Sequence, residues 1–168
     1  MRKLRLLKQK PYCCVPVCLA MILDRRIIRH DSQEKIGNDL GLIVPPESAK
    51  YFKKVRTGRR PAAGFGTQIQ KKEFSINHFF IKYKISLREK YYLPKSIGDA
   101  LAFMSSNLKS GGDIIMCFNH KTVYGKGDWG ARGRCPKSKT WKSYSLRPST
   151  WHQTFQDSQA FHSYAFAR

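Results

Sequence analysis

A buried helix that begins near a cysteine pair constrains the fold more than any other part of the chain. Pro16 suits the first position of a helix, where a backbone N–H would have no partner. The residues after it are apolar on nearly every side, which is typical of a buried helix. Arg25 and Arg26 end the pattern where cations complement the helix dipole. We therefore expect a buried helix within Gln9-Lys10-Pro11-Tyr12-Cys13-Cys14-Val15-Pro16-Val17-Cys18-Leu19-Ala20-Met21-Ile22-Leu23-Asp24-Arg25-Arg26.

The start of this helix also predicts a nucleophile. A thiol at a helix N-terminus lies at the positive end of the helix dipole, which favours the thiolate, the reactive form of cysteine. Cys14 occupies that position, and Gln9 upstream can donate an N–H to an oxyanion that forms near the sulfur. The alternative is that Cys13, Cys14 and Cys18 are small buried hydrophobic residues, as free cysteines often are.

The pattern Gln-x4-Cys-Val-Pro-x-Cys-Leu-x-Met-Ile resembles a segment of the papain-like cysteine peptidases, of the bacterial type that processes the leader peptides of bacteriocins. The resemblance covers roughly residues 9–130 and includes Ser32-Gln33-Glu34-x-Ile36 with Leu40-Gly41. It implies that Cys14 is the nucleophile and Gln9 the oxyanion-hole glutamine. Two positions depart from the family pattern, where glycine and alanine are replaced by Val15 and Val17.

The resemblance also implies the fold, which is α+β and papain-like. We expect a helical half over about residues 9–110, and the start of an antiparallel β half over residues 111–130. The substrate would be a peptide or another amide, and no cofactor is implied. A non-catalytic domain of the same fold that binds a peptide is the alternative, since a fold does not fix a reaction.

Hydrophobic periodicity predicts the remaining elements. Asp31 is expected to cap a second helix that contains Glu34 and stops at Gly41. Residues 73–87 predict a helix followed by a short strand, and residues 113–118 predict a buried strand. Residues 47–66 are expected to be a basic loop that ends in an ordinary turn at Gly64-Phe65-Gly66. A helix over residues 93–108 would carry one apolar face, formed by Ile97, Leu101, Met104 and Leu108.

From Ala131 onwards the composition changes. Leu146 is the only branched aliphatic residue of this tail, and Asp157 is its only acidic residue. No alternating strand pattern can be built from such a sequence, whereas a papain-like β half needs several buried strands in this place. We therefore expect residues 1–130 to form the domain, and residues 131–168 to be a disordered basic tail.

A one-base frameshift near Gly130 is a sharper hypothesis for the tail. The family pattern has Gly-His-Val at this point and an Asp-Pro further along. Ala131-Arg132 written GCA-CGT, followed by G, reads His-Val when its first base is dropped. Arg147-Pro148 written CGA-CCC, followed by T, reads Asp-Pro after the same shift. The genetic code allows both readings without requiring them.

The chain as written lacks the expected catalytic base. A thiol peptidase needs an imidazole to move the proton and a third group to orient that imidazole, but Ala131 and Arg147 stand in these places. His120 ranks first as a substitute base, because it lies a few residues short of the expected position. His30 and His78 precede the β half and are expected to be surface or capping residues. The remaining histidines lie in the tail, at His152 and His162.

The net charge of +21 invites a nucleic-acid interpretation. Tyr51 and Phe52 offer rings for stacking within the densest basic run. No nucleic-acid-binding motif accompanies the charge, and charge runs are more often solvated faces. Nucleic acid therefore remains an alternative partner. The basic run consists of Lys50, Lys53, Lys54, Arg56, Arg59 and Arg60.

Composition and cysteine spacing bound the other function classes. The hydrophobic fraction of 41% favours a folded domain, and no stretch approaches the about 18 apolar residues of a membrane span. Five cysteines without a secretory signal indicate free thiols and a cytoplasmic location. A metal site is not expected, because no Cys-x2-Cys or His-x3-His spacing occurs and adjacent cysteines seldom chelate one ion together.

Overall fold

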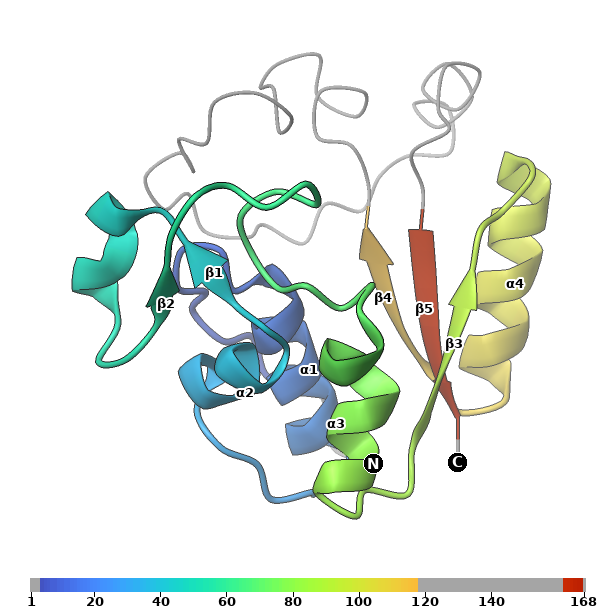
Figure 1. Cartoon of the computed structure of the whole chain (residues 1–168). Helices are drawn as coiled ribbons and strands as arrows, with labels where there is room; N and C mark the ends of the chain where they lie inside the picture. Colours follow the sequence, from blue (N-terminus) through green and yellow to red (C-terminus); the bar gives the residue numbers. More distant parts are fainter. Residues whose placement is uncertain (1–3, 118–161, 168) are drawn as a thin grey trace. The chain divides into compact units, whose positions relative to one another are not determined.

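The computed structural model describes residues 4–117 and 162–167, and the chain divides into two units, Met1–Arg88 and Glu89–Arg168. Both helices and sheets are present, so the mixed α+β class is confirmed at this level (Figure 1). The described part contains no helix with the length and apolar character that a membrane crossing needs. The elements are α1 Cys14–Arg25, α2 Gln33–Asp39, β1 Ile43–Val44, η1 Pro46–Tyr51, β2 Arg56–Thr57, η2 Lys72–Phe74, α3 Ile76–Lys82, β3 Arg88–Tyr92, α4 Ile97–Lys109, β4 Asp113–Cys117 and β5 His162–Ala167.

Helix α1 begins two residues before the proline that was expected to open it. Cys13 is the N-cap residue, and the Val17 N–H donates to the Cys13 carbonyl at 2.9 Å. Pro16 therefore lies in the third position of the helix, where its missing N–H still costs no hydrogen bond. Most of the helix is buried as the sequence predicts, through Val15, Pro16, Val17, Leu19, Ala20, Ile22 and Leu23.

Helix α2 packs closely on the first turn of α1. A Cβ added to Gly37 would lie 2.9 Å from the Leu42 side chain and 3.4 Å from that of Pro16, so glycine permits the approach. The capping residue differs from the expectation, because the Ser32 hydroxyl, not Asp31, accepts the Lys35 N–H at 3.3 Å. Asp31 instead forms an ion pair with Lys35 at 2.7 Å.

The end of α2 is correctly predicted. Gly41 has a φ of +70°, which is the left-handed conformation that follows many helices. A side chain here would also collide with the Phe74 ring, because an added Cβ would lie 2.6 Å from it. Leu40, Leu42 and Phe80 are almost completely buried and continue the core that α1 provides.

Helix α3 confirms the helix of residues 73–87, but the strand comes later than predicted. Ser75 caps α3 by accepting the His78 N–H at 3.2 Å. Asp39 of α2 holds its far end through an ion pair with Lys82 at 2.5 Å and a 2.6 Å hydrogen bond from the Tyr83 hydroxyl. That hydrogen bond raises the pKa of Tyr83 to about 12. The strand β3 starts only at Arg88.

Strands β1 and β2 form a short parallel pair. Gly66 also pairs with Ile43 of β1, with two N–H to O distances of 3.0 and 2.9 Å. The Phe65 ring lies edge-on to Tyr12, with 6.0 Å between the ring centroids. The segment at Gly64-Phe65-Gly66 is thus more than the ordinary turn expected from the sequence, because it joins β1 to the residues before Cys14.

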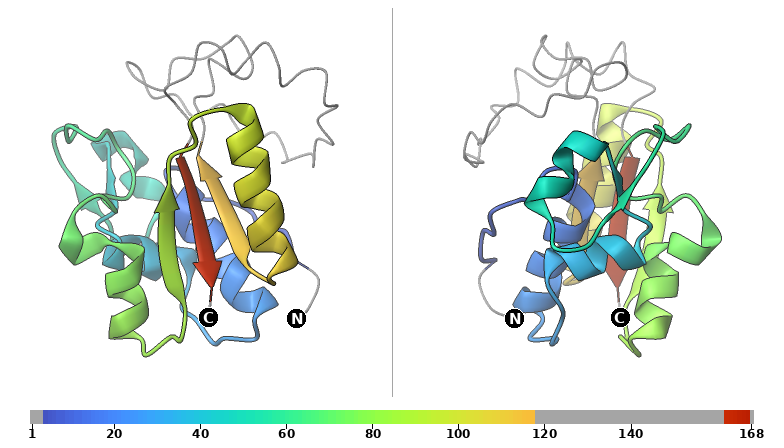
Figure 2. Two further views of the ribbon diagram at one scale, coloured as in Figure 1. Left: turned by 90° about the vertical axis from the view of Figure 1, so that its right-hand side faces the viewer. Right: turned by 60° about the vertical axis from the view of Figure 1, so that its left-hand side comes forward.

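The second unit contains a three-stranded sheet in the order β3-β5-β4. Figure 2 shows β5 between the other two strands and opposite to them in direction, with α4 along one face of the sheet. Tyr92 stacks on Phe103 of α4 with 4.0 Å between the ring centroids, and its hydroxyl donates to Asp99. The strand β4 confirms the buried strand predicted for residues 113–118.

Two residues of the apolar face predicted for α4 are largely exposed, and a third, Met104, is half-buried. Leu101 and Leu108 are 49% and 57% exposed, whereas Ala100 is buried. The helix also starts at residue 97 instead of 93, because Ser96 caps it by accepting the Asp99 N–H at 3.1 Å.

Strand β5 corrects the expectation that the tail forms no strand. It covers His162–Ala167 and pairs antiparallel with β4, with Asp113 opposite Phe166 and Cys117 opposite His162. The search for branched aliphatic residues missed the alternation of aromatic and small residues here, although aromatic residues also favour strands. His120, Ala131, Arg147 and the frameshift hypothesis lie outside the described residues.

The central place of β5 makes the tail testable. Ala165, opposite Ile114, has a neighbouring strand on both sides, so proline there removes a ladder hydrogen bond. We expect Ala165→Pro to lower the free energy of unfolding by about 1–3 kcal/mol, measured in urea, and to speed amide exchange in β4. Ala165→Ser is the control and should leave both unchanged. Unchanged exchange in the proline variant would contradict the strand.

Candidate functional site

Cys14 is the first residue of α1 and is exposed, while its neighbour Cys13 is completely buried. Cys18, one turn further along the helix, is half-buried. Burial, together with the neighbouring Cys14, raises the pKa of the Cys13 thiol to about 12, so Cys13 remains a protonated, inaccessible thiol. The interpretation of all three cysteines as buried hydrophobic residues therefore holds for Cys13 and is wrong for Cys14.

A tight turn leads into this helix. The Cys13 N–H donates to the Lys10 carbonyl at 3.1 Å, and Tyr12 has a φ of +62°. Pro11 in the second position and a positive φ in the third are the features of a type II turn, which favours glycine where Tyr12 stands. A tyrosine held in this conformation stores about 1–3 kcal/mol of strain. Gln9 and Cys14 thus lie on the two sides of one strained turn.

Packing around Cys13 holds the turn in place. Cys13, Leu42 and Val44 form a buried cluster, and three half-buried side chains pack against it, namely Tyr12, Phe52 and Val55. The Lys10 ammonium lies 5.2 Å from the centroid of the Phe52 ring, a cation–π distance. The residue before the candidate nucleophile is therefore fixed in the core, and Cys14 is fixed with it.

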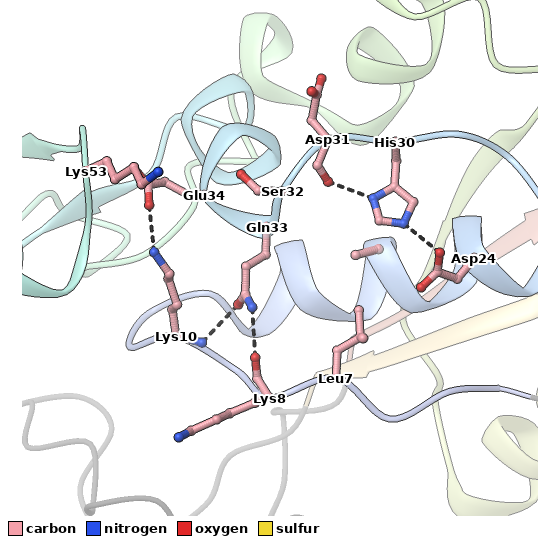
Figure 3. Close-up of a pocket in the computed structure, with 11 residues that line it drawn as sticks. Leu7, Lys8, Lys10, Asp24, His30, Asp31, Ser32, Gln33, Glu34 and Lys53 are labelled. Atoms are coloured by element: carbon pink, nitrogen blue, oxygen red, sulfur yellow. Dashed lines mark hydrogen bonds and ion pairs between the residues drawn. The ribbon is translucent and has the colours of Figure 1, made fainter.

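Gln33 of α2 holds the backbone on both sides of Gln9. Its Oε1 accepts the Lys10 N–H at 2.9 Å, and its Nε2 donates to the Lys8 carbonyl at 2.8 Å (Figure 3). One side-chain amide thus pairs with the extended segment as a neighbouring strand would. The contact fixes the backbone that carries the candidate oxyanion donor.

Glu34 adds an ionic link beside this contact. One carboxylate oxygen lies 2.7 Å from the Lys10 Nζ, and the other accepts the Lys54 N–H at 2.8 Å. Asn38 donates to the Lys54 carbonyl at 2.8 Å. Burial raises the pKa of Glu34, but the hydrogen bonds from Lys10 and Lys54 outweigh it and leave the pKa below its ordinary value.

His30 is a structural residue and not a base for Cys14. Its Nε2 lies 3.0 Å from an Asp24 carboxylate oxygen, and its Nδ1 lies 2.7 Å from the Asp31 carbonyl (Figure 3). Both ring nitrogens thus lie within hydrogen-bond distance of groups in the turn after α1 and at its end. Asp24 stands near the other end of α1, about 15 Å from Cys14 at 1.5 Å of rise per residue. His30 therefore bridges the turn between α1 and α2.

The other histidines give no base that the structure places. His78 is exposed in the first turn of α3, where its backbone N–H joins the cap at Ser75. His120 and His152 lie outside the described residues, and His162 is placed only as a position in β5. The structure thus places the candidate nucleophile Cys14 and the backbone on both sides of Gln9, and the base remains a sequence hypothesis.

A cavity of about 500 Å³ is lined on one side by Leu7, Lys8 and Lys10, and Cys14 is not part of its lining. It separates Leu7, Lys8 and Lys10 from the end of α1 and the start of α2 (Figure 3). The contacts of Gln33, Glu34 and His30 described above lie on its wall, so much of the polar lining is already paired within the protein. Among the described residues, no group of three or more His, Cys, Asp or Glu side chains is arranged for a metal ion.

Gln33 and Glu34 are the site residues that the sequence interpretation missed. They were noted only as part of the family-like Ser32-Gln33-Glu34 segment and as a helix start. A glutamine in the first turn of a helix needs no partner, so only the three-dimensional structure reveals that it holds the Gln9 backbone. The signal available in the sequence was the resemblance itself.

Comparisons with models of protein families, with curated proteins and with solved structures give no match for this chain. The geometry around Cys14 is therefore the basis for a proposed function.

The exposure of Cys14 predicts selective alkylation. With iodoacetamide at mildly acidic pH, we expect Cys14 to react first, because its position at the helix N-terminus favours the thiolate. Cys13 should stay unmodified, because it is buried and its pKa is about 12. Peptide mapping by mass spectrometry gives the rates, with Cys14→Ser and Cys18→Ser as matched variants. Equal rates at Cys14 and Cys18 would remove the case for an activated thiol.

The low pKa of Glu34 predicts a contribution to stability at neutral pH. A carboxylate whose pKa is lowered by folding stabilises the protein above its unfolded-state pKa, and this is lost as the pH falls through the folded-state value. We expect Glu34→Gln to cost about 1 kcal/mol at pH 7 and progressively less below about pH 4.5. Urea unfolding at several pH values measures this, with the exposed Glu47→Gln as control. A difference that does not change with pH would contradict the ionic link.

Proposed function

We propose that this chain is a papain-like thiol hydrolase for peptide or amide bonds, impaired as written. Cys14 is the nucleophile in this proposal, and Gln9 donates a hydrogen bond to the oxyanion of the tetrahedral intermediate. The observation that carries the proposal is the exposed Cys14 at the first position of a buried helix, next to a completely buried Cys13.

The fixed backbone around Gln9 and Cys14 supports a catalytic role for these residues over a purely structural one. An oxyanion donor is effective when its backbone is fixed before the reaction, since no reorganisation is then needed. Gln33 holds that backbone from both sides, and the turn at Tyr12 joins it to Cys14. Strained backbone is concentrated at functional sites, and the positive φ of Tyr12 lies two residues from the thiol.

The impairment follows from the proton chemistry. Attack by a thiolate leaves an acyl-enzyme only if the leaving amine receives a proton, and an oriented imidazole performs that transfer in thiol hydrolases. The positions where the family places the imidazole and its orienting group hold Ala131 and Arg147. His120 is the substitute that the sequence offers. In this proposal the chain binds the substrate and stabilises the oxyanion. It has at most a weak general base.

A comparison of the chain as written with a version whose reading frame is restored tests this proposal. We expect the chain as written to hydrolyse a panel of peptides at no appreciable rate, and a version with the frame restored after Gly130 to hydrolyse at least one of them. Cys14→Ser in the restored version should abolish that activity. Equal activity of the two versions would contradict the assignment, and so would a shifted reading frame that lacks His and Asp-Pro at the expected places in the gene.

A further inference from the structure

A basic rim is attached to the buried cluster at the start of α1. We define it as the five exposed cations of residues 50–59: Lys50, Lys53, Lys54, Arg56 and Arg59. Two apolar residues of the same segment, Phe52 and Val55, pack against the buried cluster that contains Cys13. The rim is therefore anchored to the residue that directly precedes Cys14.

The rim is not neutralised by its own segment. No acidic residue occurs between Glu47 and Glu73, so the sequence supplies no counterion within the loop. Glu34 approaches from α2, but its carboxylate is already engaged by the Lys10 ammonium and by a backbone N–H. A second contact brings the end of the loop to the site, since Phe65 lies against Tyr12. This segment thus carries a surplus of positive charge beside the turn that leads to Cys14.

We infer that this rim docks an acidic segment of a polypeptide and that the substrates of Cys14 carry Asp and Glu beside the bond presented to the thiol. The inference rests on the proposed function, because it names the substrate class of the same site. Charged surfaces around a cleft raise the local concentration of oppositely charged substrates and speed their association.

The chemistry favours a polypeptide over a nucleic acid. A thiolate attacks an acyl carbon, and the phosphodiester backbone of a nucleic acid has none. Single-stranded nucleic acids also need open aromatic faces for stacking. The Lys50 ammonium lies 5.4 Å from the centroid of the Tyr51 ring, and the Phe52 ring is half-buried with Lys10 beside it. Each of these two rings thus already has a lysine ammonium at a cation–π distance.

The test uses peptides that carry an iodoacetyl group, so that the Cys14 thiolate forms a C–S bond and iodide leaves. One peptide carries Glu and Asp, and its matched partner carries Gln and Asn. In low salt we expect the acidic peptide to alkylate Cys14 of the full chain about tenfold faster or more. We expect high salt to remove most of the difference, because it screens exposed charges.

Matched variants separate the rim from the overall charge of the protein. Lys53→Gln with Lys54→Gln should reduce the preference for the acidic peptide to less than about threefold. Arg29→Gln with Lys84→Gln removes the same charge from other exposed positions and should leave the preference unchanged. An equal loss in both double variants, or no preference in the unaltered chain, would overturn the inference.

Two further measurements distinguish a failure of the rim inference from a failure of the proposed function. Alkylation by neutral iodoacetamide should be the same in all variants, because it does not depend on the rim. If Cys14 loses its selectivity for iodoacetamide, the proposed function fails; if selectivity persists without a peptide preference, only the rim inference fails. A single-stranded oligonucleotide that protects Cys14 better than the unmodified acidic peptide would assign the rim to nucleic acid and overturn the inference.

Discussion

The burial of Cys13 is the constraint on which the candidate site depends. A small side chain that is completely enclosed by Leu42, Val44 and their neighbours cannot turn outwards without opening a cavity in the core. The next residue along a helix points about 100° away, so the same packing that hides Cys13 exposes Cys14. The candidate nucleophile is thus positioned by hydrophobic packing and not by a polar network. The polar contacts position the other partner, because Gln33 and Glu34 hold the segment around Gln9 from α2.

The sequence predicted the elements whose signals are local. The apolar run of α1, the left-handed stop at Gly41 and the short strand β4 each depend on neighbouring residues, and each was found. Cap residues were predicted less well, since Asp31 and Ser32 are chemically equivalent candidates and only the geometry selects the hydroxyl of Ser32. Likewise, Pro16 tolerates any position in the first turn, so its presence could not fix the first residue of the helix.

Long-range pairing escaped the sequence for a different reason. The link from Gln33 to Lys8 and Lys10 joins residues far apart in the chain, and no periodicity records it. The buried stripe of α4 depends on which side chains meet the sheet, and Phe103 stacks on Tyr92 while Leu101 stays exposed. Strand β5 was missed because it is stabilised by pairing with β4. The sequence of the tail alone does not reveal that pairing.

The arrangement of the second sheet limits what any restored frame can encode. Strands β3 and β4 are joined through α4 and leave a central place that β5 fills. A chain with a different tail must supply another strand between β3 and β4. Without one, the backbone groups of β3 and β4 that face this place would lose their hydrogen-bond partners. The restored sequence therefore has to provide two things at once, an imidazole for Cys14 and an alternating segment that pairs with β4. A restored frame that encodes the histidine without such a strand would leave this sheet incomplete, so the two requirements together are a stricter criterion for the hypothesis than the histidine alone.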